Sequence, residues 1–216
     1  MIITDLSIPK KDQILSASTI KQLEDCSWLH YVKKILMVPD IGNDGSKRGS
    51  ISHLIFELLL NYRHHHHFTL IMRRGFVAAS KSIERLIIKH LNQQGINTPE
   101  NRELVFDMIW VGLNQDFYAE DGVLRDPEQE FLIESKEPYY KIRGVIDQMA
   151  VYEDRIIVKD FKSQKSKFTQ DELLNNIQAM TYTLACRKKF YPNIKRVIVR
   201  FILLRFPDSP IQEVEF

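Results

Sequence analysis

Residues 144–182 constrain the fold of this chain more than any other stretch of the sequence. Apolar and polar residues alternate over 143–151 and again over 155–162, which predicts two strands joined by a two-residue loop at Glu153 and Asp154. In that register, Asp147 of the first strand lies opposite Asp160 of the second. Two carboxylates placed opposite each other destabilise a sheet, whereas a cation bound between them reverses the sign of the interaction. The hairpin therefore predicts a cation site.

Lys162 adds an ammonium group at the same end of the hairpin. It follows Asp160 by two residues, so both side chains point to the same face of the strand. Carboxylates suit hard cations such as Mg²⁺ and Mn²⁺, which polarise a phosphate and lower the pKa of a bound water. An adjacent lysine can orient that water or neutralise charge that develops on the phosphate. This combination indicates phosphodiester hydrolysis.

The order Asp147, then Asp160-Phe161-Lys162, resembles the D…(D/E)xK signature of the PD-(D/E)XK nucleases. The resemblance implies that Asp147, Asp160 and the backbone carbonyl of Phe161 hold the metal. It also implies that Lys162 positions the attacking water. A tripeptide of this kind is weak evidence alone, but the strand that precedes it and the motif that follows make the match far more specific.

That following motif pairs Gln178 with Tyr182 and is similar to the QxxxY motif of the RecB-like exonuclease branch of these nucleases. The resemblance implies that Gln178 bonds to a phosphate, a water or Lys162, and that Tyr182 helps to position the strand. The alternative is a surface amide and a half-buried aromatic residue with no role in catalysis.

Upstream, Gly49 and His53 resemble the GxxxH motif of the same family, in which the histidine is a further metal ligand. Ser50 is a candidate N-cap, which would place His53 in the first turn of a helix. Imidazole suits Mn²⁺ better than Mg²⁺, and a solvated or capping histidine is the alternative. Glu57 could lie on the same helix face or pair with a nearby basic residue. The adjacent Arg48 is a candidate substrate contact.

The helix predicted over residues 19–37 contains Cys26, which resembles a cysteine of the RecB-like family that ligates a [4Fe–4S] cluster in some members. Such a cluster is held by four cysteines, and the sequence contains only Cys26 and Cys186. A cluster could therefore form only if the parent chain extends beyond residue 216, that is, if this chain is truncated. The alternative for Cys26 is a small buried apolar residue.

Residues 62–127 are expected to form a helical insertion. Apolar residues at helical spacing over 82–91 and 100–113 predict two buried helices. Basic residues here could contact phosphates and, by family analogy, the insertion could form a wall over a DNA channel; a solvated face is the alternative. Four histidines at 64–67 point in different directions on any regular element, so we expect an exposed loop or helix end rather than a metal site.

The remaining segments predict a strand, a basic loop and a helix around the hairpin. Residues 128–135 alternate as a strand that carries Glu130, a candidate to assist the metal. After the hairpin, Lys165 and Lys167 could contact a phosphate backbone or belong to a solvated loop. Thr169 and Glu172 form a capping box that opens a helix over 170–189, and an alternating strand follows at 194–206.

Composition sets the broad class. The chain has 216 residues, of which 44% are hydrophobic and 27% charged, as expected of one globular domain. The net charge is +2, so a nucleic-acid surface must be a local patch. With two cysteines the chain is not a disulfide scaffold, and it shows neither a signal-peptide pattern nor an apolar run of ~20 residues. We expect a cytoplasmic protein without a membrane partner.

These features predict an α/β domain with a restriction-endonuclease-like core, a central mixed sheet flanked by helices, and a helical N-terminal part. The expected activity is a Mg²⁺- or Mn²⁺-dependent exonuclease that hydrolyses single-stranded DNA ends in recombination, repair or phage DNA processing. One alternative is the nuclease domain of a larger helicase–nuclease or CRISPR adaptation complex, which would act with a helicase or other partner. Another is a non-catalytic DNA-binding module of the same fold.

Overall fold

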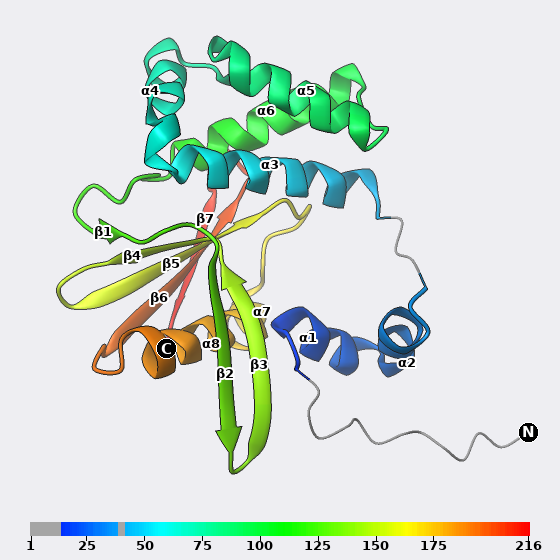
Figure 1. Cartoon of the computed structure of the whole chain (residues 1–216), viewed down its shortest axis with the longest axis vertical. Helices are drawn as coiled ribbons and strands as arrows, with labels where there is room; N and C mark the ends of the chain where they lie inside the picture. The colour runs from blue at the N-terminus through cyan, green and yellow to red at the C-terminus, as the bar shows by residue number, and fades with distance from the viewer. Residues whose placement is uncertain (1–13, 39–41) are drawn as a thin grey trace, which may run out of the picture.

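The computed structural model describes residues 14–38 and 42–216 and consists of a mixed β-sheet with helices on both faces (Figure 1). The strands follow the order β1 (Val123–Leu124), β4 (Gln148–Val151), β5 (Arg155–Lys162), β6 (Arg196–Leu203) and β7 (Ile211–Glu215). Strands β5 and β6 run parallel, and the other neighbours are antiparallel. This arrangement confirms the expected α/β class with a central mixed sheet.

The pair β4–β5 has the predicted register, in which Gln148 pairs with Lys159. The first predicted strand is interrupted, however, because the backbone bends at Asp147. Residues before the bend form β3 (Tyr139–Ile146), which pairs with β2 (Gln129–Lys136) in a separate two-stranded sheet. Asp147 therefore lies at the junction of the two sheets.

The N-terminal part is not the single helix that was predicted. It comprises α1 (Ala17–Asp25), α2 (Ser27–His30) and the π-helical turn η1 (Tyr31–Ile35). Helix α3 (Asp44–Leu60) follows and begins earlier than expected, because the Asn43 side chain accepts a hydrogen bond from the Ser46 N–H at 3.0 Å. The expectation that Ser50 caps the helix is thus wrong, and His53 lies in the middle of α3.

The helical layer above the sheet continues through residues 62–113. It comprises η2 (Tyr62–His64), α4 (His65–Arg74), η3 (Val77–Ala79), α5 (Lys81–Gln93) and α6 (Pro99–Leu113). These helices share a buried core with the sheet, to which Phe56 of α3 and Phe161 of β5 contribute stacked rings 4.2 Å apart. The four histidines span the end of η2 and the first turn of α4, as expected. No helix of the described residues is long and apolar enough to cross a membrane.

The opposite layer contains α7 (Gln170–Leu174), α8 (Ile177–Ala185) and the π-helical turn η4 (Cys186–Phe190). The predicted capping box of Thr169 and Glu172 is present. The single helix expected over 170–189 breaks after α7, because the side chain of Asn176 accepts from the Ala179 N–H at 3.0 Å and starts a new helix. After this break α8 forms a separate helix that packs against β5 and β6, on the side of the sheet away from α3 (Figure 1).

Candidate metal and active site

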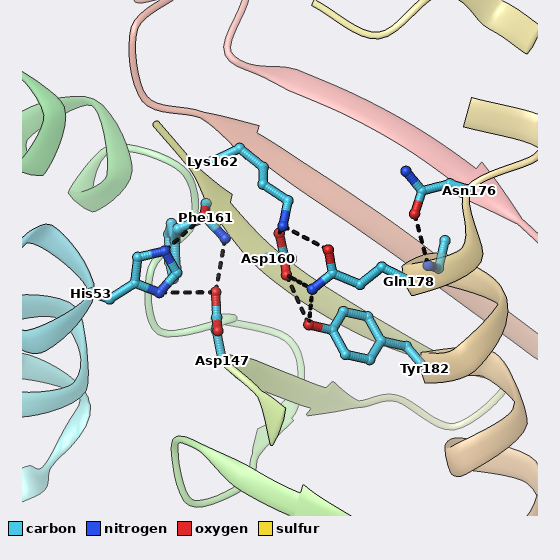
Figure 2. A network of polar contacts seen from close by, with 9 residues as sticks. His53, Asp147, Asp160, Phe161, Lys162, Asn176, Gln178 and Tyr182 are labelled. Atoms are coloured by element: carbon cyan, nitrogen blue, oxygen red, sulfur yellow. Dashed lines mark hydrogen bonds and ion pairs between the residues drawn. The ribbon is translucent and has the colours of Figure 1, made fainter. Parts of the chain in front are cut away.

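Asp147 joins the helical layer to the sheet. Its Oδ2 accepts a hydrogen bond from the Phe161 N–H at 3.0 Å and lies 3.3 Å from Nδ1 of His53. The other ring nitrogen of His53, Nε2, lies 2.8 Å from the Phe161 carbonyl oxygen. Figure 2 shows the imidazole, which comes from α3, facing both the aspartate and β5. Three of the groups predicted to hold the metal therefore meet at one point.

His53 is held as an imidazolium in this arrangement, because each ring nitrogen faces an acceptor oxygen. Burial lowers the pKa of His53, but the hydrogen bond to Asp147 and the negative charges of Asp147 and Asp160 outweigh burial and raise the pKa to about 9. The ring thus supplies positive charge to two neighbouring carboxylates. A metal ligand must be the neutral imidazole, so a cation here would replace the proton in that role.

Glu128 completes a group of three candidate metal ligands. One ligand atom each from His53, Glu128 and Asp147 lie within 4.8 Å of one another. Burial raises the pKa of Glu128 to about 7, and the negative charges of Asp147 and Glu57 add to that effect. Carboxylates crowded in this way gain from a bound cation, and two carboxylates with one imidazole suit Mn²⁺ or Mg²⁺. The donor set therefore fits a divalent metal.

Glu130 was predicted to assist the metal, whereas Glu128, which was not predicted, lies in the candidate ligand group. The backbone of Glu128 has a φ of 53°, which is uncommon outside glycine, and its N–H donates to the Asp147 carbonyl at 3.2 Å. This conformation brings the Glu128 side chain to His53, whereas Glu130 is exposed on β2 and lines a neighbouring cleft. No local sequence pattern marks a glutamate with positive φ. The sequence therefore predicts a carboxylate near the start of β2 but not which glutamate reaches the site.

Asp160 lies in a buried network beside Phe161, with its side chain 1% exposed. Its Oδ1 accepts hydrogen bonds from the Tyr182 hydroxyl at 2.8 Å and the Gln178 amide at 2.9 Å. The Lys162 ammonium donates to the Gln178 side-chain oxygen at 2.7 Å. The structure therefore brings Asp160 and Lys162 of the first motif together with Gln178 and Tyr182 of the second, from β5 and α8 (Figure 2).

The second oxygen of Asp160, Oδ2, lies 2.6 Å from the Lys162 nitrogen as an ion pair. It is fully buried, and the Lys162 ammonium is its partner among the described residues. Burial raises the pKa of Asp160, although the Lys162 ammonium opposes the rise. Asp160 is not one of the three clustered ligands, so the structure separates the predicted metal residues into a His53–Asp147 group and an Asp160–Lys162 group on either side of Phe161.

The three-ligand group opens into a hollow of about 700 Å³ between α3 and the loop after β5. A Cβ atom at Gly49 would lie 2.6 Å from Oγ of Ser163, so only glycine allows α3 to approach this loop so closely. The approach brings His53, one turn later, against Asp147. The spacing from Gly49 to His53 thus has a physical basis. Glu57 also lines the hollow.

The three predicted substrate contacts are dispersed. Arg48 is buried, and its guanidinium donates to the Asn101 side chain, so it stabilises the helical layer instead of facing the hollow. Lys165 is exposed on the loop after β5. Lys167 is exposed and donates to the Ser209 hydroxyl. Only the two lysines are therefore accessible to a substrate.

Cys26 is exposed, so its alternative reading as a buried apolar residue is wrong. Its sulfur accepts a hydrogen bond from the Leu29 N–H at 3.4 Å and thereby caps α2. The other cysteine, Cys186, is buried in η4. The histidines of residues 64–67 do not belong to the three-ligand group found within the described part of the chain.

The residues that neighbour the two aspartates point to the reverse face of the hairpin. Gln148 and Lys159 form a cross-strand pair, and both are 1% exposed. The Lys159 ammonium and the Gln148 amide donate to the backbone carbonyls of residues 115–117. These bonds fasten the loop after α6 to β4 and β5. Because side chains alternate along β5, Lys162 faces Asp160, whereas Lys159 faces the opposite side of the strand and anchors the loop at residues 115–117.

Comparison with known families agrees with this geometry. A family model described as the PD-(D/E)XK nuclease superfamily matches residues 14–213, which include both residue groups of the site. A search of curated proteins finds no match to the sequence. Because the family match covers nearly all of the chain, this protein belongs to the PD-(D/E)XK nuclease superfamily.

Proposed function

We propose that this protein is a metal-dependent deoxyribonuclease of the RecB-like branch, which removes nucleotides from single-stranded DNA ends. The observation that carries the proposal is the convergence of ligand atoms from His53, Glu128 and Asp147 within 4.8 Å of one another. Lys162 lines the hollow into which this group opens. Membership of a nuclease superfamily makes phosphodiester hydrolysis the chemistry that this combination serves.

We assign Mg²⁺ or Mn²⁺ to His53, Glu128 and Asp147, together with the Phe161 carbonyl oxygen. When bound, such an ion would polarise a phosphodiester and lower the pKa of a water. Asp160 is proposed to complete the site through Oδ2, the buried oxygen that pairs with the Lys162 ammonium. Its partner Oδ1 is already held by two donors, which fixes the direction in which Oδ2 faces.

Lys162 has the position of a group that orients water or balances charge on a phosphate. Its nitrogen lies between Asp160 and the side-chain oxygen of Gln178. Gln178 bonds to both Lys162 and Asp160, because its side-chain oxygen accepts from Lys162 while its NH₂ group donates to Asp160. We propose that Gln178 and Tyr182 act by positioning Asp160 and Lys162, since both bond directly to this pair or to each other.

The test is digestion of end-labelled single- and double-stranded DNA and of circular single strands, with EDTA, Mg²⁺ and Mn²⁺ compared. We expect metal-dependent shortening of linear single strands and none of circles. Asp160→Ala and Lys162→Ala should abolish cleavage and keep the fold, while Lys195→Ala, at an exposed lysine that lines neither hollow, serves as a control for charge. Cleavage by Asp160→Ala at the wild-type rate in Mn²⁺ would refute the site. Metal-dependent turnover would itself exclude a non-catalytic DNA-binding module.

A second candidate function is the nuclease subunit or domain of a larger helicase–nuclease or adaptation complex. Large apolar side chains are exposed on the segment that follows α1, where Trp28 is 66% and Met37 79% exposed. Exposed apolar groups that gather on one segment mark interaction surfaces. Full and specific exonuclease activity of the isolated chain would count against this candidate, whereas activity that appears only with a partner protein would favour it.

A further inference from the structure

A second hollow adjoins the metal site. The hollow around His53 and Asp147 and a larger cleft of about 1020 Å³ are both lined by Lys162 and Gln164. The cleft lies between α1, the β2–β3 hairpin and helices α7 and α8. A DNA strand with a phosphate at the metal site can therefore place the adjoining nucleoside in this cleft.

The charges that line the cleft do not suit a phosphate group. Four acidic residues oppose three basic ones, namely Glu24, Glu130, Asp171 and Glu172 against Lys21, Arg143 and Lys162. Two of these basic residues already have acidic partners, because Lys162 pairs with Asp160 at 2.6 Å and Lys21 with Asp25 at 3.3 Å. A phosphate in the cleft would meet net negative charge, so the lining favours an uncharged group.

Neutral hydrogen-bonding groups in the cleft are free to meet such a ligand. The side-chain oxygen of Asn176 caps α8, so its NH₂ group has no partner among the described residues, and Figure 2 shows that group pointing away from the helix. Gln164 donates its amide nitrogen to the Ser166 carbonyl at 2.7 Å, and its side-chain oxygen accepts no hydrogen bond within the described ranges. Phe131, Val145 and Phe168 add apolar lining.

We propose that this cleft is a base-binding subsite, which takes the unpaired nucleoside next to the phosphodiester bond that is cleaved. A nucleobase has flat apolar faces and donors and acceptors on its edges, which match the apolar and amide groups of the lining. The inference rests on the proposed nuclease function for the identity of the ligand. A base in a duplex has its pairing edge occupied, so such a subsite selects unpaired strand ends.

Two substitutions test the subsite while leaving the metal ligands in place. Asn176→Ser keeps a side-chain oxygen that can cap α8 but removes the free NH₂ group. Val145→Trp fills the cleft from β3, at a position that is 38% exposed. Leu132→Trp is the matched control, because Leu132 is a similarly exposed aliphatic residue on the paired strand β2 and does not line the cleft.

The primary measurement is the binding of fluorescent single-stranded oligonucleotides in EDTA, so that it does not depend on turnover. Oligonucleotides with a complete end are compared with ones that carry an abasic nucleotide at successive positions from each end; cleavage in Mn²⁺ is followed in parallel. We expect wild-type protein and Leu132→Trp to bind the complete end about tenfold more tightly than the best-placed abasic end. Val145→Trp should bind complete and abasic ends equally. In Asn176→Ser the ratio of the two affinities should fall about three- to tenfold.

Equal binding of complete and abasic ends by the wild-type protein would overturn the subsite, and so would an unchanged preference in Val145→Trp. The outcome also separates this inference from the proposed reaction. A base preference that Val145→Trp removes, in a protein that cleaves no DNA, supports the subsite and refutes the nuclease. Metal-dependent cleavage that ignores abasic positions supports the nuclease and refutes the subsite.

Discussion

The Tyr182 hydroxyl donates a buried hydrogen bond of 2.8 Å to Oδ1 of Asp160 and so ties α8 to β5. The same oxygen accepts from Gln178 at 2.9 Å. Because Asp160 is almost completely buried, each of these donors replaces water that a carboxylate would otherwise bind. The orientation of Asp160 therefore depends on a residue that is not one of the three candidate metal ligands.

Tyr182→Phe should lower the single-turnover rate of cleavage by about ten- to a hundredfold, because a hydrogen bond to a charged group is worth ~1.5–3 kcal/mol. The fold should persist, since phenylalanine keeps the edge-to-face contact with Phe131 at 6.3 Å between ring centroids. The control is Tyr152→Phe, a ring that lies under Arg155 outside the site. A wild-type rate for Tyr182→Phe would show that the hydroxyl does not position Asp160.

Glu128→Gln should weaken Mn²⁺ binding at least tenfold, since even the loss of an outer-shell partner costs a metal site ~10–100-fold in affinity. Glu130→Gln makes the same chemical change two residues later, on an exposed side chain, and should leave the affinity unchanged. Calorimetric titration of each variant with Mn²⁺ distinguishes them. Equal losses in both variants would contradict the assignment of Glu128 as a ligand.

Gly49→Ala should reduce both cleavage and stability. Its Cβ would lie 2.6 Å from Oγ and 3.3 Å from Cβ of Ser163. Rotation of the Ser163 hydroxyl relieves the first contact but not the second, so we expect α3 to shift slightly and the contact between His53 and Asp147 to lengthen from 3.3 Å. Overpacking of this kind costs ~1–3 kcal/mol of unfolding free energy, which a denaturant titration measures. Adding Ser163→Gly removes the obstructing atoms and should restore part of the rate; if the double variant is no better, the loss does not come from this contact.

The two cysteines should differ sharply in reactivity. Cys26 is exposed and Cys186 is buried. Burial also raises the pKa of the Cys186 thiol to about 12, and the thiolate is the reactive form. We expect the native protein to consume one equivalent of a thiol reagent at pH 8 and the unfolded protein two, as counted by absorbance. Cys26→Ser should leave no reactive thiol in the native state.

The same pKa predicts how stability changes with pH. In the unfolded chain the Cys186 thiol loses its proton near its usual pKa of ~8.5, whereas in the folded protein it keeps the proton until about pH 12. Between these values the folded state binds more protons, so its stability falls as the pH rises. Denaturant titrations at pH 8 and pH 10 should show a smaller decrease for Cys186→Ala than for the wild type.

The register of the hairpin could be predicted because strand alternation and a two-residue loop allow only one pairing. Helical structure over Gln178 and Tyr182 was predicted from periodicity, although the capping box starts α7 and the separate start of α8 at Asn176 was not predicted. The resemblance to a family supplied the roles of these two residues. Similarly, Gly49 and His53 were found by motif, and the structure adds the reason, which is the close approach of α3 to Ser163.

Other features depend on contacts that the local sequence does not mark. The positive φ of Glu128 is maintained by its hydrogen bond to the Asp147 carbonyl, a tertiary contact. Asn43 caps α3, but asparagine is equally common in turns, so the residue type alone does not predict the start of this helix. The break before Asn176 has the same origin, with neither glycine nor proline to signal it.

Lys159 and Lys162 occupy opposite faces of β5, the first beneath the loop at residues 115–117 and the second beside Asp160. A slip of β5 by one residue would exchange these faces and turn Asp160 and its ammonium partner away from the metal ligands. A chain with that error could retain its helical content and compactness yet hydrolyse nothing. Catalytic turnover is thus a more demanding criterion of correct strand alignment in this protein than any spectroscopic measure of its secondary structure.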